Sequence, residues 1–165
     1  NEHIAMTKKI LNLSFLIILL CINGCGYKPI LTGSDYNFSI KVGNSSGNEE
    51  INSNIENRLK VLNGIKKTFK VDIISNETKS ILSKDSKGDP TILEIVINLN
   101  YKLIEGGKVL VNRNLTQRST YNNISDKFEL SKSEEILKDN FIENFVSDII
   151  NSASNFILNP MINDN

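Results

Sequence analysis

An unbroken two-residue periodicity in the middle of the chain limits its fold more than any other feature. From Leu93 to Leu103 every second residue is a large aliphatic residue or tyrosine, and most residues between them are polar. A double glycine, Gly106-Gly107, follows, and the alternation then returns as far as Tyr121. Alternate side chains of a strand point to opposite faces, so the pattern indicates two long strands that each bury one face. The sequence therefore predicts a long β-hairpin.

The turn of this hairpin can be predicted from the positions of its apolar residues. A two-residue loop would place Glu105 opposite Lys108 and would set odd-numbered residues against even-numbered ones. The apolar series would then oppose polar residues such as Asn112 and Asn114. Matching odd with odd requires a loop of odd length, so we expect three loop residues with a bulge at a glycine.

A strand and a helix are predicted before the hairpin. The strand covers 35–42, with apolar even-numbered residues, and a turn follows over 43–47. The helix is expected to begin at Asn48, a good N-cap residue, and to end with Gly64 as its C-cap. One face of this helix is apolar and the other polar, which is typical of a helix that covers one side of a sheet.

A further strand and a second helix complete the prediction. The strand lies around 69–73, and the polar stretch 76–90 is expected to be a long exposed loop. Ser-Lys-Ser-Glu over 131–134 has the form of a capping box. Apolar residues then recur at helical spacing from Leu137 until the Asn-Pro pair at 159–160 stops the helix.

The predicted order is therefore β-α-β-β-β-α, which indicates an α+β fold. We expect a two-layer sandwich, in which a four-stranded, mainly antiparallel sheet with a long hairpin carries two helices on one face. The length suits one domain, assigned to 35–158, with 159–165 as a loose C-terminal tail.

The first segment of the chain has the pattern of a secretory signal peptide. Met6 is the expected start, two lysines follow, and the apolar run over 10–22 is shorter than the roughly 20 residues that span a membrane. Ile-Asn-Gly-Cys over 22–25 resembles the bacterial lipobox, where cleavage precedes a cysteine whose sulfur carries diacylglycerol. We therefore expect 1–24 to be a signal peptide, Cys25 to be lipidated with acyl chains such as palmitate, and 25–34 to be a tether.

Composition restricts the chemistry open to the mature chain. Removal of 1–24 would take away His3, the only histidine, and Cys21, and would leave one acylated cysteine. Histidine-dependent catalysis and a Cys/His zinc site would then be impossible. The 19 basic residues balance the 19 acidic ones, so the basic field that nucleic-acid binding requires is missing. We expect no enzyme, no catalytic residues, no metal, no cofactor and no nucleic-acid partner.

Paired carboxylates, as glycosidases use, remain an open alternative to this expectation. The visible pairs are Glu49-Glu50 and Glu134-Glu135. Both fall in the first turn of a predicted helix, where favourable interaction with the helix dipole explains them.

The opening of the mature chain resembles that of the LPS-assembly lipoprotein family (LptE). Cys-Gly-Tyr-Lys-Pro-Ile over 25–30 is similar to the Cys-Gly-aromatic-basic-Pro-aliphatic opening of alphaproteobacterial members. The predicted order of elements is similar to the family's topology over nearly the whole mature chain. The resemblance implies a Gram-negative outer-membrane lipoprotein, anchored on the periplasmic side, that assists assembly of an LptD-type LPS-translocon β-barrel, plugs it and contacts LPS. Gly26, rather than Asp, after the cysteine favours the outer membrane.

A plug needs a polar surface toward the polar lumen of its barrel. The even-numbered face of the hairpin is of this kind, and Lys102 and Arg118 on it are the candidate contacts for LPS phosphates. Arg113 has the apolar parity, so it is expected either to mark a strand end or bulge or to pair with a carboxylate. The polar residues of this hairpin face are Asn98, Asn100, Lys102, Asn112, Asn114, Thr116, Arg118 and Thr120.

Two other classes of protein remain open. The chain is also compatible with an auxiliary lipoprotein of a lipid-transporting ABC system, which is likewise a small acylated α+β domain. An anchor between the membrane and peptidoglycan is a third class, but no convergent Asp/Arg cluster indicates a saccharide- or peptide-binding cleft.

Overall fold

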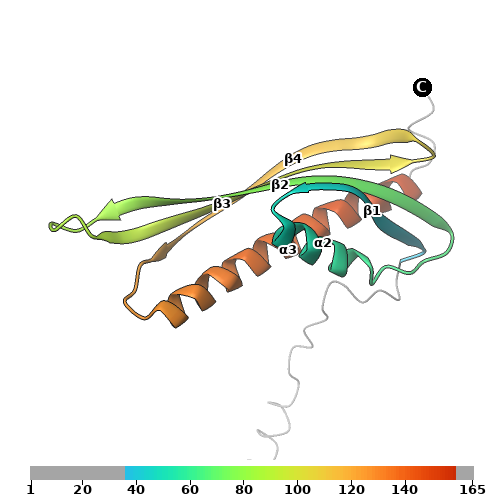
Figure 1. Cartoon of the computed structure of the whole chain (residues 1–165). Coiled ribbons are helices and arrows are strands. Elements are labelled where there is room, and N and C mark those ends of the chain that lie inside the picture. The colour runs from blue at the N-terminus through green and yellow to red at the C-terminus, as the bar shows by residue number, and fades with distance from the viewer. Residues whose placement is uncertain (1–35, 159–165) are drawn as a thin grey trace, which may run out of the picture. The chain divides into compact units, whose positions relative to one another are not determined.

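The computed structural model of the chain describes residues 36–158, and it confirms the predicted order of elements (Figure 1). The predictions for 1–34, with the signal peptide and Cys25, and for 159–165 lie outside the described residues. The elements are β1 (Phe38–Gly47), α2 (Glu49–Leu59), β2 (Lys67–Lys84), β3 (Pro90–Glu105), β4 (Lys108–Asn122) and α3 (Lys127–Leu158).

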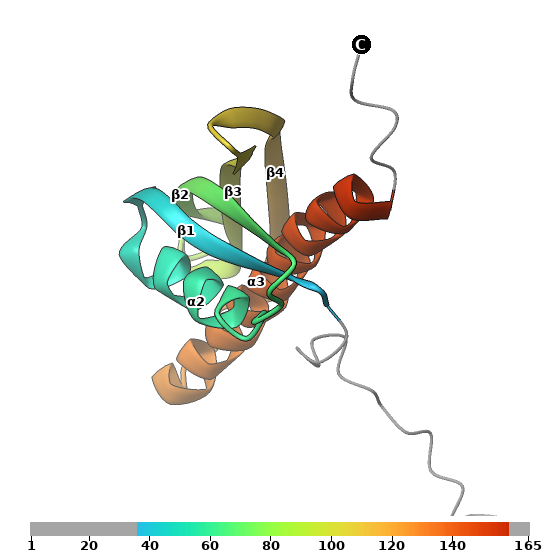
Figure 2. The same cartoon turned by 90° about the vertical axis from the view of Figure 1, so that its right-hand side faces the viewer.

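The four strands form one sheet in the order β1-β2-β3-β4. β1 is parallel to β2, because α2 forms the crossover between them, and the other two pairings are antiparallel. Both helices lie on the same face of the sheet (Figure 2). The α+β two-layer sandwich is therefore confirmed.

The core lies between this face and the two helices. The odd-numbered apolar series of β3 is buried from Ile95 to Leu103, as its periodicity predicts. On α3 the apolar residues from Phe141 to Ala153 face the sheet or α2 and are buried. The other buried apolar residues are Phe38, Ile40, Ile51, Ile55, Leu59, Leu62, Phe69, Val71 and Ile73.

The prediction for the hairpin turn is half right. Odd-numbered residues do face odd-numbered ones, since Leu103 pairs with Val111. However, the loop has two residues, the two glycines, and Glu105 pairs with Lys108. Both glycines have positive φ, 54° and 84°, which a tight two-residue hairpin favours and which other residues rarely adopt. The register is instead corrected inside β4, where Leu110 is the extra residue of a bulge.

Two predicted loops are in fact strand. β2 continues through the supposed loop 76–90 as far as Lys84, and it pairs with β3 over this length. Most of its residues there are polar because the helices cover little of this end, while backbone pairing with β3 still holds the strand. The turn is confined to 85–89, where the Asp85 carboxylate accepts hydrogen bonds from two backbone N–H groups. Likewise, β1 runs through the predicted turn 43–47, with a bulge after Val42.

The helix ends confirm one prediction and correct two others. Asn48 caps α2 as expected, accepting a 3.1 Å hydrogen bond from the Ile51 N–H, but α2 ends at Leu59 and not at Gly64. Gly64 serves close packing, because an added Cβ would lie 2.1 Å from the Phe38 nitrogen. α3 begins four residues before the predicted capping box, and Asp126 caps it by accepting from two backbone N–H groups at 2.9 and 3.2 Å.

Candidate binding surface

The face of the sheet opposite the helices is mostly polar, and we call it the polar face. It consists of outward-pointing side chains of all four strands, with the even-numbered residues of the β3–β4 hairpin at its centre. Registered rows such as Asn76–Asn98–Thr116 cross three strands, and Thr116 Oγ1 donates a 2.7 Å hydrogen bond to Asn98 Oδ1. The predicted polar hairpin face therefore exists and continues onto β2.

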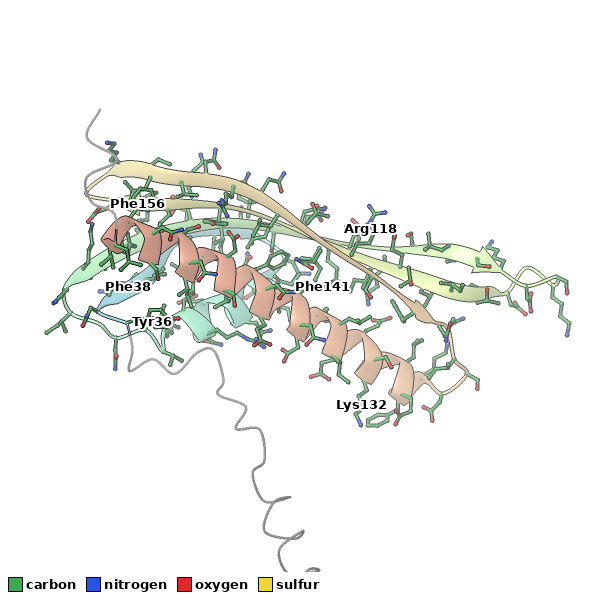
Figure 3. The ribbon with its side chains drawn as sticks, turned by 180° about the vertical axis from the view of Figure 1, so that it is seen from behind. Tyr36, Phe38, Arg118, Lys132, Phe141 and Phe156 are labelled. Atoms are coloured by element: carbon green, nitrogen blue, oxygen red, sulfur yellow. The ribbon has the colours of Figure 1, made fainter. Side chains whose placement is uncertain are left out.

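The polar face does not bring the two predicted phosphate contacts together. Lys102 pairs with Asn112, whereas Arg118 pairs with Val96. The two cations are thus six residues apart along β3, roughly 20 Å. Arg118 points away from the helices (Figure 3) and forms a 3.2 Å ion pair with Glu94. A single phosphate group cannot contact both side chains.

Lys102 belongs instead to a group of three lysines on three neighbouring strands, which we call the lysine cluster. Lys41 of β1 stands directly beside Lys70 of β2, and Lys102 of β3 pairs with Asp72, two residues beyond Lys70. Asp72 lies 3.2 Å from the Lys70 ammonium, and within residues 36–158 no carboxylate forms an ion pair with Lys41 or Lys102. The cluster thus holds three cations and the single carboxylate of Asp72, and its net positive charge favours an anionic ligand.

The bulge of β1 holds this carboxylate in place. Asn44 donates to Asp72 twice, from its backbone N–H at 2.8 Å and from its side-chain amide at 3.1 Å. The backbone hydrogen bond from Asn44 is the main reason that the pKa of Asp72 is lowered, with Lys70 adding to the effect. Two shallow hollows adjoin Asp72 and Lys70, one of about 220 Å³ beside Lys102 and one of about 550 Å³ beside Lys41.

On the opposite face, the polar residues join α3 to the sheet. Arg113 donates to Asp148 at 2.8 and 3.1 Å, which confirms carboxylate pairing as the reason for its apolar parity. The Tyr101 hydroxyl donates to the same carboxylate at 2.6 Å and lies 2.8 Å from Ser152 Oγ. Burial, followed by the hydrogen bond to Asp148, raises the pKa of Tyr101 to about 12.

A second polar contact holds the first turns of α3. Glu134 accepts from the Tyr121 hydroxyl at 2.5 Å and from the Lys79 ammonium. Burial raises the pKa of Glu134, but hydrogen bonds from Lys79 and Tyr121 outweigh it and leave the pKa lowered. The helix-dipole explanation is therefore wrong for Glu134, because this residue lies beyond the first turn of α3 and binds side chains of the sheet. Glu50 pairs with Lys138 at 2.8 Å.

Residues 36–158 offer neither a metal site of acidic, His or Cys side chains nor a membrane-spanning helix. No group of three or more His, Cys, Asp or Glu side chains in this range is arranged to hold a metal ion. None of the helices described there is long and apolar enough to cross a membrane.

Comparisons with known proteins show what the fold is similar to. No protein-family model matches the chain. No curated protein matches it in sequence. The fold is similar to that of rare lipoprotein B from Shewanella oneidensis, at a TM-score of 0.54 and 16% identity over 74% of this chain and 96% of that one. It is also similar to uncharacterized lipoprotein B from Nitrosomonas europaea, at a TM-score of 0.53 and 22% identity over 80% and 92% of the two chains. The chain thus has the fold of these lipoproteins.

Proposed function

We propose that this chain is an outer-membrane lipoprotein, anchored on the periplasmic side through acyl chains on Cys25, that assists assembly of the LPS-translocon β-barrel and plugs it. The observation that carries the proposal is the polar face, a surface of mostly hydrogen-bonding side chains on a sheet whose other face is the core. Its fold, shared with two lipoproteins, and the lipobox-like segment 22–25 support the proposal.

The chemistry of the polar face suits the lumen of a large barrel. The lumen of such barrels is polar and lined by side chains of many kinds. Amide side chains both donate and accept hydrogen bonds, so they meet such a wall without fixed charge pairs. Five asparagines of the polar face, in three adjacent rows, provide this: Asn76, Asn98, Asn100, Asn112 and Asn114.

The lysine cluster is the part of this surface that we propose to contact LPS. Phosphate groups are anionic acceptors, and ammonium groups on neighbouring strands can surround one from several sides. Lys102 remains a candidate contact, with Lys41 and Lys70 beside it. Arg118 stands apart on the same face and is proposed to contact a separate anionic group.

Site-specific photo-crosslinking in the host tests the plug. A photoreactive residue at Asn100, in the middle of the polar face, is expected to capture the LPS-translocon barrel in the outer-membrane fraction. The same residue at Asn57, exposed on α2 on the opposite side, is the control and is expected to capture no barrel. Capture of an inner-membrane ABC permease from Asn100 would favour the auxiliary-lipoprotein alternative, and capture of the barrel from neither position would contradict the plug.

Charge removal tests the contact with LPS. The triple variant Lys41→Gln, Lys70→Gln, Lys102→Gln is expected to bind purified LPS about tenfold more weakly, since several ion pairs to phosphate are lost. The control triple Lys87→Gln, Lys127→Gln, Lys132→Gln removes the same charge from exposed positions at the other end of the domain. Equal weakening by both triples would show that net charge, and not the cluster, attracts LPS.

A further inference from the structure

The two edges of the sheet are built differently. β1 is ten residues long, has a bulge and contains Gly43 and Gly47. β4 is fifteen residues long, contains neither Gly nor Pro, and is regular after its bulge at Leu110. Figure 2 shows β4 at the edge away from β1 and α2. An edge strand has unpaired backbone N–H and C=O groups on its outer side, so a long regular one can pair with another strand.

The charges on β4 do not protect this edge. Exposed cations on an edge strand commonly prevent association by repulsion. Beyond Lys108 at the turn, the charged residues of β4 are Arg113 and Arg118. Arg113 is paired with Asp148 and Arg118 with Glu94, so each of these cations already has a carboxylate partner within the chain.

The helix beneath β4 adds a second surface next to the open edge. Because Asp148 binds Arg113, the side of α3 that carries Asp148 lies under β4. Asn144, four residues before Asp148, and Asn151 and Asn155, three and seven residues after it, lie on that side at helical spacing, and all three are exposed. Amide side chains donate and accept, so a row of them is complementary to its own copy across a two-fold axis.

We propose that β4 pairs antiparallel with β4 of a second copy of this chain, joining the two sheets into one. In such a pair, opposed residues share a face of the sheet. Arg113 and Arg118 lie on opposite faces of the sheet, so they cannot oppose each other in the dimer. Each would oppose the same arginine of the second copy only if the two-fold axis passed through it. The axis is assigned to Thr116, the midpoint of the regular stretch from Val111 to Tyr121. This register sets Asn114 opposite Arg118. The proposal goes beyond the proposed function and does not depend on any barrel.

Cysteine pairs test the pairing and its register. The full chain in mild detergent carries Cys21→Ser and Cys25→Ser, so that each introduced thiol is the only one. Thr116→Cys is expected to form a disulfide-linked dimer on mild oxidation, since cross-strand Cα distances of about 4.5–5.5 Å suit a disulfide. Asn114→Cys mixed with Arg118→Cys is expected to form the mixed dimer only. The control Asn98→Cys, beside Thr116 but on β3, is expected to stay monomeric; absence of every β4 crosslink overturns the proposal.

A matched pair of lysine variants tests the same edge without oxidation. Thr116→Lys and Asn98→Lys each remove the hydrogen bond between these two residues and add one cation to the same row of the polar face. Only Thr116→Lys places like charges opposite each other in the dimer. Sedimentation velocity is expected to show its dissociation constant raised about fivefold and that of Asn98→Lys unchanged. A chain that stays monomeric up to about 1 mM, or equal weakening by both variants, overturns the proposal.

Discussion

The two ends of the sandwich hold α3 to the sheet by different means. At one end, which we call the covered end, residues 141–153 of α3 and all of α2 pack apolar side chains against β1, β2 and β3. At the other, the far end, residues 127–138 of α3 are held to the sheet by Glu134, which binds Lys79 of β2 and Tyr121 of β4. Apolar residues at the far end stay exposed, with Ile81 at 49% and Phe128 at 73%.

The two kinds of contact have different effects on the stability of the fold and on the position of α3 against the sheet. At the covered end the stabilisation comes from the hydrophobic effect, which is non-directional and supplies most of the favourable free energy of folding. A hydrogen-bonded ion pair contributes little net free energy because it exchanges protein–water for protein–protein bonds, but it does define geometry. We therefore expect the covered end to decide whether the domain folds, and the far end to decide how closely α3 follows the sheet.

The largest expected effect is at the covered end. Phe145→Ala removes a fully buried ring between α3 and the sheet, and we expect the free energy of unfolding to fall by about 3–5 kcal/mol. Chemical denaturation of the purified domain measures this change. Phe128→Ala, which removes the same ring from the far end, should change the free energy by less than about 0.5 kcal/mol. Similar losses from the two variants would break the comparison.

A smaller effect is expected from the polar contact that the covered end does contain. Tyr101→Phe removes the hydroxyl that binds Asp148 and leaves buried Ser152 without this partner. We expect a loss of about 1–2 kcal/mol in the free energy of unfolding. Tyr36→Phe is the control, since no hydrogen bond of its hydroxyl is found within residues 36–158, and it should be close to neutral.

The same hydroxyl gives this prediction a pH dependence. The pKa of Tyr101 is about 12 in the folded protein and about 10 unfolded, so its contribution is complete below pH 10 and is lost as the pH rises through 12. Tyr101→Phe should therefore lose stability less steeply than the native protein between pH 10 and 12. Tyr121, whose pKa is also raised, is present in both chains and cancels in the difference. Identical slopes would contradict the role given to the Tyr101 hydroxyl.

The comparison also explains which parts of the fold could be predicted from the sequence. At the covered end, burial demands apolar residues at a fixed period, so strand β3, both helices and the odd-with-odd register were predictable. At the far end no core demands such a period. Residues 76–84 therefore have a polar pattern that indicates a loop, although their backbone is paired with β3. The helix start was missed for a related reason, because a single Asp at 126 is a weaker signal than the capping-box form at 131–134.

The candidate site was predictable only in part. The polar parity of Lys102 and Arg118 placed both correctly on one face, since parity follows from the strand alone. Their separation along the hairpin, and the closeness of Lys102 to Lys70 and Lys41, depend on which strands are neighbours and in what register. The parallel pairing of β1 with β2 across α2 carries no local signal in the sequence, so the lysine cluster could not be found before the fold was known.

A modest effect is expected where α3 begins at the far end. Asp126→Ala removes the side chain that accepts from two backbone N–H groups, and we expect a loss of about 1 kcal/mol together with fraying of the first turn. Ser131→Ala, in the sequence that resembles a capping box, should not destabilise the chain, because an exposed helical Ala is favourable. Thermal or chemical denaturation of both variants decides between Asp126 and Ser131 as the start of the helix.

The smallest expected effect tests whether the polar contact at the far end positions α3 rather than stabilises the fold. Glu134→Gln removes the charge that Lys79 and Tyr121 bind, and we expect the free energy of unfolding to fall by only about 0.5–1 kcal/mol. Hydrogen exchange should nevertheless accelerate in residues 127–138 and stay unchanged in 141–153.

The folded-state pKa of Glu134 is lowered, so its contribution is present above the ordinary pKa of 4.5 and is lost as the pH falls through the folded value. The difference between Glu134→Gln and the native chain should therefore shrink on acidification. The neighbouring control Glu135→Gln is exposed and should change neither quantity. Faster exchange throughout α3 in Glu134→Gln would show that the two ends act as one unit, because local opening would then have become global.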